Sequence, residues 1–87
     1  MGVRADTIVR ETLRDSLSLD QARVDAMDAH TPLFGALPEL DSMAVATLLT
    51  ELEDRLGTII DDDEVDAEML ETFGALVAFA KKKLSRR

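Results

Sequence analysis

Three segments of the chain repeat apolar residues at the spacing of an α-helix. They cover about residues 3–17, 42–56 and 73–84. In each segment apolar residues recur three or four positions apart with polar residues between them, as in a helix with one buried face. These faces predict a shared core made of Val9, Leu13, Leu17, Val45, Leu48, Leu49, Leu52, Leu56, Leu76, Val77 and Ala80.

Residues beside these segments supply start and stop signals for the helices. Asp41 precedes the second segment, and its carboxylate can accept hydrogen bonds from the free amides of a first helical turn. Gly57 follows that segment and suits the left-handed conformation that often ends a helix. Thr72 precedes the third segment and is a suitable cap for it. The second helix is therefore the best defined of the three.

Residues 18–41 form a long connection with no clear periodicity. The connection contains both prolines and is longer than most loops of compact domains. Apolar residues along it predict an ordered strap held against the core: Leu19, Val24, Met27, Leu33, Phe34, Leu37 and Leu40. With a further short helix over about residues 66–70, we predict an all-α fold. It is an antiparallel four-helix bundle with three main helices, a short third helix and a long first loop, in a single domain over residues 1–87.

The charge of the chain is negative and unevenly distributed. The net charge is −8, which argues against nucleic acid and against an anionic membrane surface as partners. Residues 39–72 contain twelve acids and one base, whereas residues 73–87 contain five bases and no acid. We therefore expect basic partner proteins to meet the middle of the chain. Neither a signal peptide nor a membrane-spanning run is evident, so we expect a cytoplasmic protein with no membrane span.

The residues needed for most enzymatic chemistry are missing. His30 is the only histidine, there is no cysteine, and the four glycines are isolated, so no catalytic triad, cysteine zinc site or phosphate loop is predicted. The acidic run at residues 61–64 does not fit the calcium-binding loop of EF-hands in either register. We expect no catalytic residues and no metal site.

Asp41-Ser42 at the start of the second helix is the most informative pair. A helix N-terminus presents free amides and the positive end of the helix dipole, which suits a phosphate group. The Ser42 hydroxyl could therefore hold a phosphodiester. From the residues alone, a simple capping pair explains the same sequence.

The run Leu33-Phe34-Gly35-Ala36-Leu37-Pro38-Glu39-Leu40-Asp41-Ser42-Met43 resembles the prosthetic-group site of acyl carrier proteins. The order of helices along nearly the whole chain is also similar to that family. The resemblance implies that Ser42 carries 4′-phosphopantetheine, that Asp41 orients its transfer, and that Met43 replaces the usual leucine. It further implies a discrete carrier that holds acyl groups as thioesters and has no catalytic activity of its own.

The same resemblance implies a set of partners for a monomeric carrier. They are a phosphopantetheinyl transferase, an acyl-loading ligase or acyltransferase, and other enzymes acting on the acyl chain. The docking acids would be Glu53, Asp54, Asp62 and Asp66. Ala44 and Thr47 stand where carriers of fatty acid synthesis often have acids. The chain looks similar to specialised carriers encoded with exosortase or secondary-metabolite systems.

Three alternatives stay open at this point. The first is a carrier loaded with an amino acid or an aryl acid, because the cargo is chosen by the loading ligase. The second is a non-enzymatic acidic adaptor in which Ser42 stays unmodified. The third is a calcium-responsive helical module.

Overall fold

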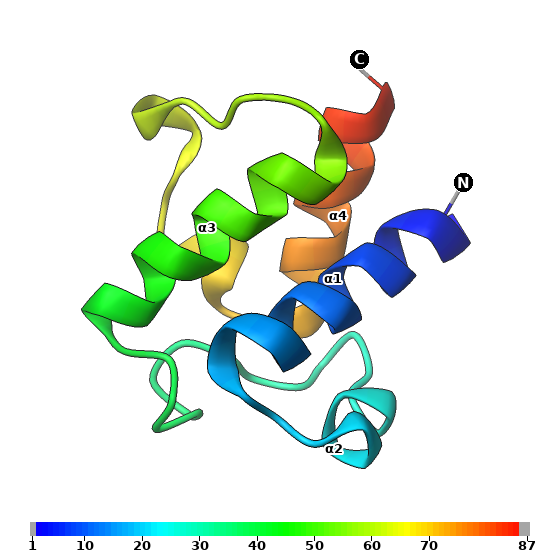
Figure 1. Ribbon diagram of the computed structural model, residues 1–87, viewed down its shortest axis with the longest axis vertical. Coiled ribbons are helices and arrows are strands. Elements are labelled where there is room, and N and C mark those ends of the chain that lie inside the picture. Colours follow the sequence, from blue (N-terminus) through cyan, green and yellow to red (C-terminus); the bar gives the residue numbers. More distant parts are fainter. Residues whose placement is uncertain (1, 86–87) are drawn as a thin grey trace.

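The computed structural model describes residues 2–85, and the regular elements of these residues are helices (Figure 1). The long helices are α1 (Gly2–Leu17), α3 (Ser42–Leu56) and α4 (Phe73–Ser85). The shorter ones are α2 (Gln21–Asp25) and two 3₁₀ helices, η1 (Asp62–Glu64) and η2 (Glu68–Leu70). The long helices coincide with the three predicted segments and η2 with the predicted short helix, which confirms the all-α fold.

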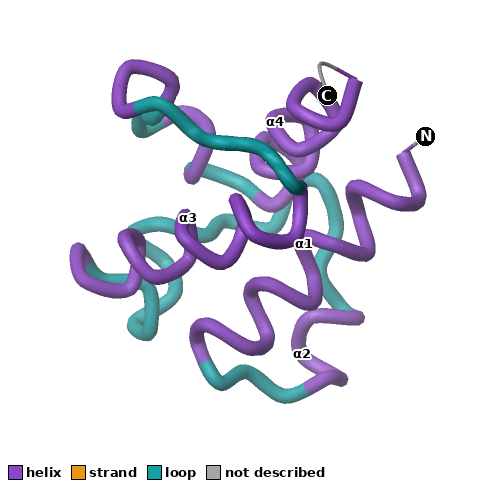
Figure 2. Tube along the Cα trace, turned by 45° about the horizontal axis from the view of Figure 1, so that its top comes forward, coloured by secondary structure: helices purple, strands orange, loops and turns teal. Residues whose placement is uncertain are grey.

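Helix α1 contacts both other long helices, and α3 runs back across it in the opposite direction (Figures 1 and 2). The core lies between the three, where leucines of all of them are fully buried. Burying one such side chain contributes about 1.5–3 kcal/mol. Most of the predicted core is confirmed: Val9, Leu13, Leu17, Leu48, Leu52, Leu56, Leu76 and Ala80 are buried.

Four apolar residues are less buried than the sequence predicts. Val45, Leu49 and Val77 are only partly buried, because each of them borders an open pocket at the surface. Phe34, which we expected to pin the strap to the core, keeps 48% of its surface exposed. Phe34 instead lines the same pocket as Val45.

The connection over residues 18–41 is an ordered strap, as predicted, but it also contains the unpredicted helix α2. Helix α2 has five residues, of which only Val24 is buried. Further along, backbone hydrogen bonds join strap residues 29–34 to residues 70–74. They are Gly74 N to Ala29 O (3.1 Å), Phe73 N to Thr31 O (2.8 Å), Leu33 N to Glu71 O (3.0 Å) and Phe34 N to Leu70 O (2.9 Å). This ladder holds the strap against the start of α4.

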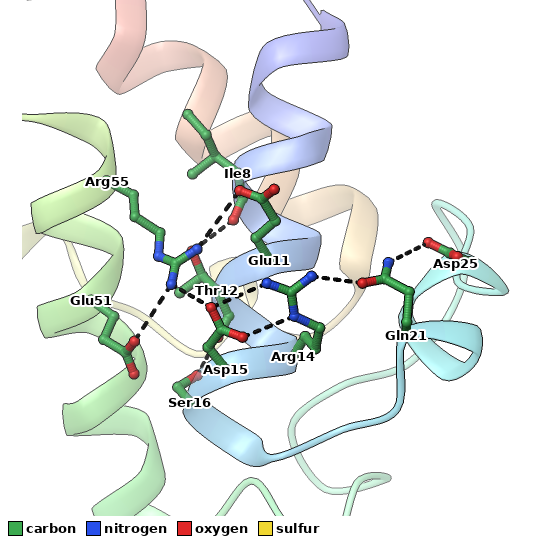
Figure 3. A network of polar contacts seen from close by, with 10 residues as sticks. All are labelled: Ile8, Glu11, Thr12, Arg14, Asp15, Ser16, Gln21, Asp25, Glu51 and Arg55. Carbon is green, nitrogen blue, oxygen red and sulfur yellow. Dashed lines mark hydrogen bonds and ion pairs between the residues drawn. The ribbon is translucent and has the colours of Figure 1, made fainter.

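Arg55 of α3 joins that helix to α1 through carboxylates (Figure 3). Its guanidinium lies 2.6 Å from Asp15, and at 3.7 and 3.8 Å from Glu11 and Glu51. Arg14 also donates to Asp15, at 2.8 Å. The hydrogen bond from Arg14, together with that from Arg55, lowers the pKa of Asp15 to about 2. The network links the C-terminal end of α3 to α1, in addition to the core packing between these two helices.

A second ion pair attaches the loop after α3 to α4. The Lys83 ammonium lies 2.8 Å from the Glu64 carboxylate, and their side chains are only 9% and 17% exposed. Glu64 also accepts a hydrogen bond from the Asp61 amide, which closes a capping box around η1. Within residues 2–85, none of the helices is both long and apolar enough to cross a membrane.

Candidate functional site

Ser42 is the first residue of α3, and its side chain is exposed. Asp41 before it is in an extended conformation, and its carboxylate accepts a hydrogen bond from the Ala44 amide at 2.8 Å. This geometry confirms Asp41 as the N-cap of α3. The Ser42 hydroxyl makes no hydrogen bond with other residues in the described range 2–85. It is therefore open to modification, next to the positive end of the helix dipole.

The chain before Asp41 fixes the entry into α3. Leu40 is buried, and its amide donates to the carbonyl of Leu37 at 3.1 Å. Gly35 has a φ of 91°, in the left-handed region that favours glycine. The turn at Gly35 turns the chain back from the ladder toward Ser42. Because Leu40 is anchored in the core, the capping pair is held in place from both sides.

An open, largely apolar pocket of about 370 Å³ lies beside Ser42. Its walls come from the strap, from α3 and from the loop around η2: Phe34, Ser42, Val45, Val65, Asp66, Ala67 and Leu70. A group attached to the Ser42 hydroxyl would begin at the rim of this pocket. The pocket therefore offers apolar contact to whatever that group carries.

The exposed face of α3 next to Ser42 is largely uncharged. Met43 is 83% exposed, and the exposed residues after it on this helix are Ala46, Thr47, Thr50 and Asp54. The acidic stretch of the sequence thus does not surround Ser42 on α3. Apart from Asp41, its exposed carboxylates lie at the far end of the helix and in the loop that follows, where Asp66 lines the pocket beside Ser42.

The four predicted docking acids have different surroundings. The Glu53 carboxylate accepts from the Ile60 amide at 2.7 Å, and that of Asp66 accepts from the Met69 amide at 2.9 Å. Both therefore hold loop backbone in place. The carboxylates of Asp54 and Asp62 are exposed and make no hydrogen bond with the part of the chain that the structure describes. The structure brings Glu53 and Asp62 to one pocket and places Asp66 at the pocket beside Ser42.

Two exposed apolar residues were missed as parts of a surface. Phe34 lines the pocket beside Ser42, and Ile59, 70% exposed, lies after the end of α3. Only for Ile59 did the sequence offer a signal of exposure, because it stands with Ile60 directly before the acidic run at residues 61–64. No group of three or more His, Cys, Asp or Glu side chains within the described residues could hold a metal ion.

Comparison with known proteins agrees with this geometry. Residues 7–80 match the family described as phosphopantetheine attachment site. The chain is 33% identical over 76 residues to an acyl carrier protein of Exiguobacterium sp. (strain ATCC BAA-1283 / AT1b). The matched residues make up 87% of this chain and 89% of that protein. The solution NMR structure of a holo acyl carrier protein from Nitrosomonas europaea is similar with a TM-score of 0.82. That match has 42% identity and covers 93% of this chain and 95% of the other.

The matches first define a class, the phosphopantetheine-binding carriers. The chain belongs, within that class, to the acyl carrier protein family, whose members are carriers and not enzymes. Its prosthetic group is covalently bound 4′-phosphopantetheine. The described residues fit this group, because an exposed hydroxyl stands at a helix N-terminus beside an open apolar pocket. Family membership also implies partner enzymes such as transferases.

Proposed function

We propose that Ser42 carries the phosphopantetheine arm and that the chain acts as a discrete carrier domain over residues 1–87. The arm would hold acyl groups as thioesters and present them to partner enzymes. The observation that carries this proposal is the exposed, unbonded Ser42 hydroxyl at the first residue of α3. Asp41 supports it, because its carboxylate accepts from the Ala44 amide and so starts the helix at the reacting Ser42.

Attachment of the arm requires one nucleophilic step on this chain. The Ser42 oxygen forms a bond to the phosphorus of coenzyme A that bears the pantetheine. The bond from that phosphorus to the bridging oxygen breaks, and adenosine 3′,5′-bisphosphate leaves. The hydroxyl proton passes to a base supplied by the phosphopantetheinyl transferase. The chain needs no base of its own, which agrees with a site that contains no histidine or cysteine.

The arm also supplies the working thiol that the cysteine-free chain lacks. The pocket beside Ser42 favours an acyl cargo, because its lining is mostly aliphatic and aromatic carbon. Phe34 and Leu70 form one side of the pocket, and Val45 and Val65 lie among its other lining residues. A chain that enters between them would be shielded from water near the thioester.

The surface around Ser42 indicates how partner enzymes would dock. A phosphopantetheinyl transferase and an acyl-loading ligase or acyltransferase would contact Met43 and the uncharged residues that follow it on α3. Basic side chains of the partner would meet Asp54 and Asp62, whose carboxylates are exposed and unbonded within residues 2–85. Glu53 and Asp66 would add less, because their carboxylates already hold backbone amides.

This uncharged face supports a specialised set of partners, of the exosortase-associated or secondary-metabolite kind, in place of those that serve carriers of fatty acid synthesis. Thr47, where such carriers often have an acid, is exposed on that face. We also propose that the carrier acts as a monomer in the cytoplasm. The net charge of −8 supports the monomer, since like charges oppose self-association.

Mass spectrometry of the intact protein tests the proposal. After incubation with coenzyme A and a broad-range phosphopantetheinyl transferase, the mass should rise by about 340 Da, the mass of the arm. The gain should vanish in Ser42→Ala and persist in Ser85→Ala, which removes an exposed hydroxyl elsewhere. Absence of any gain with several transferases would instead favour an unmodified adaptor.

A further inference from the structure

Most positively charged side chains of the described chain are paired with a carboxylate. These are Arg10, Arg14, Arg23, Arg55 and Lys83. Arg4, Lys81 and Lys82 are exposed and have no hydrogen-bond or ion-pair partner for their side chains among residues 4–85. These three side chains are therefore available to an anion from outside the chain.

The three unpaired cations gather at one place. They line an open pocket of about 410 Å³ together with Leu84 and Ser85. The pocket lies where the beginning of α1 meets the end of α4, near the labelled N and C ends in Figure 1. The beginning of α3, with Ser42, lies on the opposite side of the molecule in Figures 1 and 2.

Helix stability explains only part of this cluster. Lys81 and Lys82 lie near the C-terminal end of α4, where positive charge is favourable for the helix dipole. Arg4 lies in the first turn of α1, where positive charge is unfavourable and where no acid is present. Asp6 shares the neighbouring pocket with Lys81, but its carboxylate is already bound by Arg10 at 2.5 Å.

We propose that Arg4, Lys81 and Lys82 form a binding site for a ligand with two or more phosphate charges. Arginine presents parallel N–H donors that match a phosphate, and lysines add compact positive charge. A multivalent phosphate would relieve the mutual repulsion of the three cations. Leu84 gives the site an apolar edge. The sequence continues with Arg86 and Arg87, which have the same sign of charge.

The phosphate could belong to a free polyphosphate compound or to a lipid headgroup, and both sources share this chemistry. The site does not depend on the function proposed for Ser42. The net charge of −8 led us to expect no anionic partner. The site limits that expectation, because charges are screened over a Debye length of only about 8 Å at physiological salt. A phosphate at this pocket would experience the local cations more strongly than the distant acids.

Titration with inorganic pyrophosphate, followed by NMR and begun at an ionic strength of about 0.15 M, tests the site. Amide signals at the beginning of α1 and the end of α4 should shift, and the binding should weaken as salt is added. The double variant Lys81→Gln/Lys82→Gln should bind at least tenfold more weakly. The matched control Arg14→Gln/Arg23→Gln has the same charge change at paired cations and should bind within twofold of the wild type.

Vesicles distinguish the two sources of phosphate. Co-sedimentation with vesicles that contain cardiolipin, whose headgroup has two phosphates, but not with vesicles of phosphatidylcholine alone, would support the site and identify a lipid headgroup. Binding of pyrophosphate without binding to vesicles would support it and identify a free compound. The proposal is overturned if neither probe binds. It is equally overturned if the lysine double variant, with an unchanged circular dichroism spectrum, binds both probes as the wild type does.

Discussion

Gly74 lies where the strap is hydrogen-bonded to the start of α4, and the variant Gly74→Ala tests whether that contact holds the strap. A Cβ at this position would lie 2.7 Å from the Ala29 carbonyl oxygen, 2.9 Å from Ala29 Cβ and 3.0 Å from Ala29 Cα. The oxygen would have to retreat by about 0.7 Å, the difference between 2.7 Å and an ordinary contact of 3.4 Å. The same oxygen accepts the Gly74 amide at 3.1 Å, so the displacement also strains that hydrogen bond.

Two opposing effects determine how much Gly74→Ala changes the free energy of unfolding. Overpacking against backbone costs about 1–3 kcal/mol. Replacing glycine by alanine in a helix returns up to about 1 kcal/mol. We therefore expect Gly74→Ala to lower the free energy of unfolding by about 1–2 kcal/mol, which for a domain of this size lowers Tm by about 5–15 °C.

Urea unfolding followed by far-UV circular dichroism measures this change, since the chain has no Trp or Tyr for fluorescence. Ala78→Gly, at an exposed position of the same helix, provides the control for helix propensity alone. Hydrogen exchange adds a local readout, because the Leu33 amide should exchange faster in Gly74→Ala if the ladder loosens. A Gly74→Ala variant as stable as the wild type, or more stable, would show that this close contact does not hold the strap.

Three further changes should affect stability through contacts described above. Asp41→Ala should cost about 1 kcal/mol through loss of the cap of α3, and Asp41→Asn should cost less, as measured by urea unfolding. The hydrogen bond from Arg14, together with that from Arg55, lowers the pKa of Asp15 from 3.8 to about 2. The stabilisation from these hydrogen bonds is fully present above pH 4 and is lost as the pH falls toward 2. Acid titration of Asp15→Asn should therefore show a smaller loss of stability over that range than the wild type shows. Lys83→Met should cost about 1–3 kcal/mol, because the partly buried Glu64 carboxylate loses its ammonium partner.

Each of these expectations has a distinct contrary outcome. Equal losses for the Ala and Asn variants of Asp41 would mean that the cap hydrogen bond is unimportant. Parallel acid titrations of wild type and Asp15→Asn would remove the ion-pair network as a source of acid sensitivity. For Lys83, a double-mutant cycle with Glu64→Gln should give a coupling energy clearly above zero, and additive effects would contradict the pair.

The sequence predicted α3 completely because three independent signals agree there. An apolar stripe, the capping Asp41 and the left-handed Gly57 all set the same bounds, and the structure has both caps. Helix α2 escaped prediction because five residues with one buried side chain give no measurable period. The end of α1 at Leu17 was predicted from the apolar stripe alone, since Ser18 takes a φ of 56° where a glycine would have been a stop signal.

The site was predictable where it depends on local chemistry and not where it depends on distant backbone. Asp41-Ser42 could be placed at a helix start from neighbouring residues alone. The amides bound by Glu53 and Asp66 could not be assigned from the spacing of side chains. The ladder between residues 29–34 and 70–74 was hidden for the same reason, because backbone pairing leaves no pattern of polar and apolar residues. The isolated Gly74 was the only residue in the sequence that could have indicated this ladder.

The hydrogen bond from the Phe34 amide to the Leu70 carbonyl allows movements of the pocket beside Ser42 to be followed at a single amide. Both residues line that pocket from segments far apart in the sequence, so this bond makes two of its walls a single rigid unit. Widening the pocket without breaking the bond would have to move α3 or the residues around Val65. Hydrogen exchange at this one amide would therefore separate two ways in which a cargo enters. Unchanged protection on loading would mean that the opposite wall moves, and lost protection would mean that the strap itself opens.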